Sequence, residues 1–170
     1  MKRDSYRVWI IFLAAAGLGV LLHFLHGWFP NAFTALISPV RESLWEHLKI
    51  VFFPLLLVGL VLGGKRGFTP WLFSLLAVCA LTLSTGWLYN VVFQGPWDWV
   101  NILIYFLLMA VGFLLPRLLW PLSDWPGIGA ACAILTVILA TLMILFTDNP
   151  PDHILFRDLS EARTWVTIPV

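Results

Sequence analysis

Charged residues are scarce in this 170-residue sequence, where Asp, Glu, Lys and Arg together supply only 11% of the chain. A surface that binds nucleic acid needs clustered basic side chains, whereas the ten Lys and Arg residues are spread thinly and the formal net charge is +1. We therefore expect no nucleic-acid partner.

Cysteine and recognised catalytic motifs are also lacking. Cys79 and Cys132 stand alone in apolar runs without C-x-x-C spacing, so the sequence predicts neither a disulfide framework nor a thiolate metal site. There is no H-E-x-x-H, no G-x-S-x-G and no phosphate-binding glycine loop. No short motif identifies a reaction.

Apolar residues are abundant, at 61% of the chain with a mean hydropathy of +0.92, which is far outside the range of a water-soluble domain. Because about 20 apolar residues cross a bilayer, the sequence predicts an all-α integral membrane bundle. Residues 1–147 are expected to form one domain of about five transmembrane helices, and residues 148–170 a polar tail. The expected helices lie near 8–29, 43–63, 69–91, 98–116 and 127–147.

The basic residues of the short loops predict the orientation of this bundle. The side with more Lys and Arg should be cytoplasmic, which places the N-terminus inside and the C-terminal tail outside. That side carries Lys2, Arg3, Arg7, Lys65, Arg66 and Arg117, and the other carries Arg41, Lys49, Arg157 and Arg163.

A polar segment, R-E-S-L-W-E-H-L-K at residues 41–49, opens the second predicted helix on the outer side. The apolar residues that follow, 50–62, rise only about 20 Å, whereas the hydrocarbon layer is about 30 Å thick. The polar segment is therefore expected to dip into the outer leaflet, at the depth of two histidines near the outer end of the first helix. Ionisable residues at that depth usually face the bundle interior or a water-filled cavity. We predict an outward-facing site built from His23, Glu42, Glu46, His47 and Lys49, with His26 as a further member.

Imidazole and carboxylate groups in such a site suit a divalent transition metal such as zinc, with one position left for water. His23, His26 and His47 are the predicted metal ligands. The predicted catalytic residues are Glu42, Glu46 and Lys49, with one of the two carboxylates as general base. The chemistry would be that of a metal-binding protein or a metal-assisted hydrolase acting on lipid or envelope material.

Two other functions fit the same residues. Glu46, His47 and Lys49 suit a proton or ion relay in a small transporter or channel, which in a short chain without an inverted repeat would require a homo-oligomer. Alternatively, the charges form neutralised pairs that anchor the helix in a non-catalytic assembly or regulatory protein. In every case membrane lipid is a partner, and the polar tail is either solvated or folded back over the outer mouth.

The segments R-E-S-L-W-E-H-L-K, H-F-L-H and P-D-H-I-L-F-R-D resemble a family of small bacterial polytopic membrane proteins of unknown function. In that family an N-E-S-x-W-E-H-x-K stretch opens the second helix. Arg41 replaces the asparagine here, and the remaining specified positions match. The resemblance implies a multi-pass protein of the bacterial cytoplasmic membrane, and it implies no activity.

Overall fold

The computed structural model describes residues 2–159, and the remainder of the predicted tail, residues 160–170, lies outside the described residues. Six α-helices and three short helical segments follow one another along this part of the chain, which contains no strand. The α-helices are α1 (Lys2–Trp28), α2 (Ala32–Ile37), α3 (Leu48–Leu62), α4 (Gly64–Trp87), α5 (Asp98–Leu118) and α6 (Pro126–Asp148). The short segments are η1 (Leu88–Val92), η2 (Trp120–Asp124) and η3 (Ile154–Phe156).

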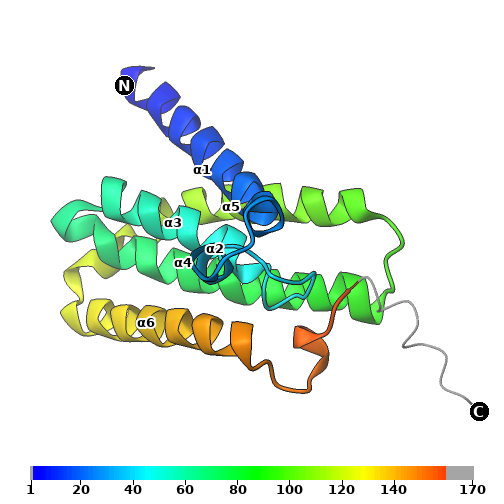
Figure 1. The fold of residues 1–170 in the computed structure, drawn as a ribbon. Coiled ribbons are helices and arrows are strands. Elements are labelled where there is room, and N and C mark those ends of the chain that lie inside the picture. Colours follow the sequence, from blue (N-terminus) through cyan, green and yellow to red (C-terminus); the bar gives the residue numbers. More distant parts are fainter. Residues whose placement is uncertain (1, 160–170) are drawn as a thin grey trace, which may run out of the picture.

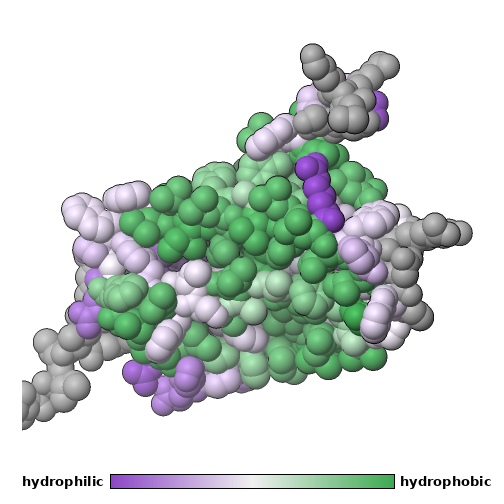
Figure 2. Space-filling model, turned by 180° about the vertical axis from the view of Figure 1, so that it is seen from behind, coloured by the Kyte–Doolittle hydropathy of each residue, from purple (hydrophilic) through white to green (hydrophobic). Residues whose placement is uncertain are grey.

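Four segments are long and apolar enough to cross a membrane, and α3 is a shorter apolar helix beside them. The four are Tyr6–Trp28, Gly67–Val92, Asp98–Leu118 and Gly127–Asp148. Figure 2 shows a broad apolar surface with most hydrophilic residues near its margins. Such a surface is costly in water and stable in lipid. The predicted all-α membrane bundle is confirmed, while its orientation stays a prediction from the loop charges.

Helix α4 lies at the centre of the bundle, in contact with α3, α5 and α6 (Figure 1). Helix α1 contacts α3 and α5, and its N-terminal half leans away from the other helices (Figure 1). The inner face of α3 is almost fully buried, with Leu48, Val51, Phe52 and Leu55 each at most 1% exposed. This packing fixes the start of α3, which is the element that positions the polar segment.

Three helix starts differ from the predicted ones, and the first is that of α1, which begins at Lys2 instead of residue 8. Helix α3 begins at Leu48 instead of residue 43, because the backbone N–H groups of Leu48 and Lys49 donate to carbonyls three residues back and make tight turns. Helix α4 begins at Gly64 instead of residue 69. Gly64 has a φ of +53°, a conformation that glycine adopts without strain, so the chain turns from α3 into α4 within two residues.

The crossing of α1 over its neighbours is close at Gly19. A Cβ atom at this position would meet the Tyr105 hydroxyl of α5 and the Ile50 carbonyl of α3. The same hydroxyl donates a hydrogen bond of 2.8 Å to the Ala16 carbonyl. The crossing therefore holds the C-terminal half of α1, with His23 one turn further along, against the start of α3.

Replacing Gly19 with alanine should lower the stability of the bundle by about 1–3 kcal/mol, because the added methyl group has no space at the crossing. The measurement is the thermal unfolding midpoint of the detergent-purified protein. Gly17→Ala is the matched control, since a Cβ there meets nothing within 4 Å. Equal midpoints for the two variants would show that the crossing is not tight.

Candidate metal site

Three of the six predicted site residues meet near the start of α3. His23 comes from α1, Glu42 from the loop after α2, and His47 from the residue just before α3. His23 Nε2 lies 3.8 Å from Glu42 Oε1, and His47 Nε2 lies 3.3 Å from Glu42 Oε2. One ligand atom from each residue lies within 4.8 Å of the other two. We call this group the His23–Glu42–His47 triad.

The loop that carries Glu42 is tied to α1 next to the triad. Ser38 donates from its hydroxyl to the Leu22 carbonyl at 2.5 Å and accepts the backbone N–H of His26 at 3.0 Å. Ser38 is fully buried, so these bonds are shielded from water. The loop that carries Glu42 is in this way held beside the part of α1 that carries His23.

His47 is oriented by the backbone of the same turn. Its Nδ1 lies 2.7 Å from the Ser43 carbonyl oxygen. Because a carbonyl oxygen can only accept a hydrogen bond, Nδ1 carries the proton of this bond. The other ring nitrogen, Nε2, faces the Glu42 carboxylate. This contact with a backbone carbonyl is the one that metal-binding histidines commonly make through their second ring nitrogen.

The electrostatics of the Glu42 and His47 pair favour a positive charge between them. Burial lowers the pKa of His47, but its hydrogen bonds with Glu42 and Ser43 and the charges of Glu42 and Glu46 outweigh this and raise the pKa. The hydrogen bond from His47 lowers the pKa of Glu42, against the opposing effects of burial and of the Asp158 charge. A proton shared between the two side chains is therefore stabilised here.

His23 adds a second imidazole to this pair. Its ring centroid lies 5.2 Å from that of His47. Its Nδ1 is buried and has no hydrogen-bond partner among the described residues, which is unusual for a buried polar atom. The side chains of His23, Glu42 and His47 keep 25%, 54% and 23% of their surface exposed, so an ion can reach them. Two imidazoles and one carboxylate fit a borderline cation such as zinc.

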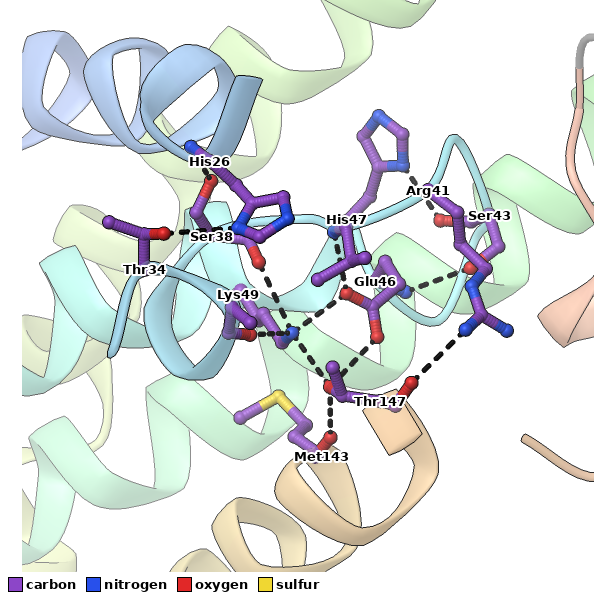
Figure 3. Close-up of polar contacts among 12 residues, drawn as sticks. His26, Thr34, Ser38, Arg41, Ser43, Glu46, His47, Lys49, Met143 and Thr147 are labelled. Carbon is purple, nitrogen blue, oxygen red and sulfur yellow. Dashed lines mark hydrogen bonds and ion pairs between the residues drawn. The ribbon is translucent and has the colours of Figure 1, made fainter. Parts of the chain in front are cut away.

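Glu46 and Lys49 lie outside the triad and form a buried ion pair with each other (Figure 3). Lys49 Nζ is 2.7 Å from Glu46 Oε2, 2.8 Å from Thr147 Oγ1, 2.7 Å from the Ala35 carbonyl and 3.2 Å from the Ser38 carbonyl. The Glu46 side chain is 2% exposed and that of Lys49 is 0% exposed. The pair thus joins α2, α3 and α6. The catalytic roles predicted for Glu46 and Lys49 stay predictions.

His26 is also separate from the triad. Its Nδ1 lies 3.0 Å from the Thr34 hydroxyl, which links α1 to α2 (Figure 3). The structure therefore brings together two of the three histidines that the sequence predicts as metal ligands, His23 and His47, and it adds Glu42 to them.

Residues 2–165 match a family model described as "Family of unknown function (DUF6512)". The chain belongs to this family. The matched region contains the whole triad, and the match confirms the predicted resemblance to a family of unknown function. Comparisons with curated proteins and with solved structures give no match.

The described part of the tail folds back beside the triad. The backbone N–H of Trp45 donates to the Leu155 carbonyl at 3.0 Å, and the N–H of Leu159 donates to the Glu42 carbonyl at 2.7 Å. The Phe156 ring lies 5.0 Å from the Trp45 ring. Sequence reasoning left this fold-back open. The apolar I-L-F at residues 154–156, inside a polar tail, is the feature of the sequence that could have predicted it.

Proposed function

We propose that this chain is a membrane protein that binds one divalent transition-metal ion, with zinc favoured, through His23, Glu42 and His47. The observation that carries the proposal is the hydrogen bond from His47 Nδ1 to the Ser43 carbonyl. It leaves Nε2 as the coordinating atom and directs it at the Glu42 carboxylate.

The ligand set supports a catalytic ion more than a purely structural one. Structural zinc sites usually have four protein ligands, whereas catalytic zinc sites have three and keep one position for water or substrate. When bound, such an ion polarises substrate oxygens and lowers the pKa of a coordinated water to about 7. The proposed activity is therefore metal-assisted hydrolysis at the membrane surface, and the partly exposed triad would bind and orient the ion.

The relay alternative receives less support from the contacts. Glu46 and Lys49 are bound to each other, and Lys49 also donates to oxygens of α2, of the residue after α2 and of α6. That arrangement is typical of a tie between helices, because every polar atom of a buried pair needs a partner. We therefore assign the chemistry to the triad and a stabilising role to the Glu46–Lys49 pair.

The test is elemental analysis of detergent-purified protein that has been loaded with zinc and passed over a chelating resin. The wild type should retain about one zinc ion per chain, as expected for a single site with three protein ligands. Glu42→Gln should retain almost none, because an amide does not supply the anionic ligand. Asp152→Asn, which alters an exposed carboxylate paired with Arg157, is the control and should retain the metal. A wild type that holds no zinc after loading would contradict the proposed function.

A further inference from the structure

The folded-back tail runs antiparallel to the segment that carries two of the triad residues. Its hydrogen bonds join Trp45 to Leu155 and Glu42 to Leu159. Residue numbers therefore rise along the tail while those of the paired loop residues fall, which is an antiparallel pairing. Phe156 anchors the tail between the Trp45 and Phe146 rings, at centroid distances of 5.0 Å and 5.3 Å. The register is therefore defined by both backbone and side-chain contacts.

This register places Asp158 beside the triad. Asp158 directly precedes Leu159, whose N–H donates to the Glu42 carbonyl at 2.7 Å. Its side chain is partly buried. Asp158 also acts electrostatically on the Glu42 carboxylate, more weakly than His47 and His23 do. A second carboxylate is therefore carried by the stretch of chain that lies beside the triad.

The Asp158 carboxylate does not belong to the group of atoms that lie within 4.8 Å of one another. An aspartate side chain turns about two single bonds, however, and the backbone next to Asp158 is already fixed to Glu42. Two carboxylates that lie near one another repel each other, and a divalent cation shared between them removes that repulsion. The tail thus offers the kind of ligand that the triad lacks for a four-coordinate site.

We propose that Asp158 is a fourth ligand, which the tail brings to the metal ion held by His23, Glu42 and His47. This inference rests on the proposed function, because it requires an ion in the triad. With the tail in place the ion has four protein ligands and little room for water. With the tail displaced, the fourth position opens. The tail would then control whether the bound ion meets substrate.

The experiment is a zinc titration of the full-length protein in detergent, in competition with a chromophoric chelator. Asp158→Asn should weaken zinc binding at least about tenfold, the scale of losses when groups that support a metal site are removed. Asp152→Asn is the matched control, because it removes an exposed carboxylate six residues away that pairs with Arg157 at 2.9 Å. It should bind zinc like the wild type.

A second variant separates the ligand from the tail that carries it. Phe156→Ala removes the anchor between the Trp45 and Phe146 rings and leaves all four proposed ligands in the sequence. It should also weaken zinc binding and should speed zinc release to the chelator. Thermal unfolding midpoints verify that both variants are folded.

The outcomes distinguish this inference from the proposed function. Zinc binding by the wild type with an unchanged affinity in Asp158→Asn would overturn the role of Asp158 and leave the triad intact. Equal losses in Asp158→Asn and Asp152→Asn would also overturn it, because they would point to the general charge of the tail. A wild type that binds no zinc would overturn both proposals.

Discussion

Lys49→Met should lower the free energy of unfolding by about 3–5 kcal/mol, the usual cost of removing one partner from a buried ion pair. Glu46 is 2% exposed and would be left as a buried carboxylate without its cation. The Ala35 and Ser38 carbonyls would lose a donor at the same time. The measurement is thermal or denaturant unfolding in detergent, followed by circular dichroism.

Two further variants sharpen this experiment. The double variant with Glu46→Gln and Lys49→Met should be more stable than Lys49→Met alone, since it removes the unpaired charge. Arg157→Met breaks an exposed pair, in which the Arg157 and Asp152 side chains are 52% and 88% exposed, and it should cost less than about 1 kcal/mol. If Lys49→Met costs no more than Arg157→Met, the pair does not tie the helices together. Folded Lys49→Met protein should still bind zinc, because Lys49 lies outside the triad.

His47→Ala should weaken zinc binding by more than about 100-fold, because removal of a direct ligand should exceed the loss of roughly 10–100-fold that accompanies removal of an outer-shell partner. His23→Ala should have an effect of similar size. The measurement is again competition with a chromophoric chelator. His47 makes its described polar contacts with Glu42 and the Ser43 carbonyl, so the variant should keep the helical bundle.

The other histidines provide controls for that result. His26 is bound to Thr34, and His153 is an exposed residue that accepts the backbone N–H of Leu155 at 3.3 Å. Alanine at either position should leave zinc affinity unchanged. If His26→Ala lost as much zinc affinity as His47→Ala, the result would contradict the triad as the ligand set. It would instead support the three histidines that the sequence alone predicts.

The helical type of the fold and the places of its long apolar helices could be predicted from the sequence, because a long apolar run in lipid must satisfy its own backbone hydrogen bonds. The start of α3 could not. Ser43 Oγ accepts the N–H of Glu46 at 3.2 Å, and Trp45 bonds to Leu155 from the distant tail. The start of α3 therefore depends in part on a contact with a distant residue, which the local sequence pattern does not show.

The same boundary explains why only three of the six predicted site residues meet. In a regular helix from residue 43, Glu46 would share a face with Lys49 and with residue 42, and His47 would point about 100° away. The turn before Leu48 instead directs Glu46 and Lys49 into the bundle and leaves His47 beside Glu42. The expected depth in the membrane predicted that the end of α1 and the polar segment lie close together. The turn before Leu48 determined which of their side chains are in contact.

The proximity of Asp158 to the triad could not be predicted from its neighbours in the sequence. It depends on the docking of Phe156 against Trp45 and on the hydrogen bond from Leu159 to Glu42. A polar tail predicts solvation by composition alone. The three apolar residues at 154–156 changed that outcome, because they bury surface against α6 and the turn before α3.

X-ray absorption spectroscopy at the zinc edge of the loaded wild type tests the metal triad most directly. We expect a first shell of imidazole nitrogens and carboxylate oxygens at about 2.0–2.2 Å, with the outer-shell scattering of two histidine rings. His47→Ala and His23→Ala should each remove one ring from that signal or abolish zinc binding. Sulfur scattering at about 2.3 Å, or an oxygen shell without histidine, would show that the ion binds elsewhere and would contradict a metal site at His23, Glu42 and His47.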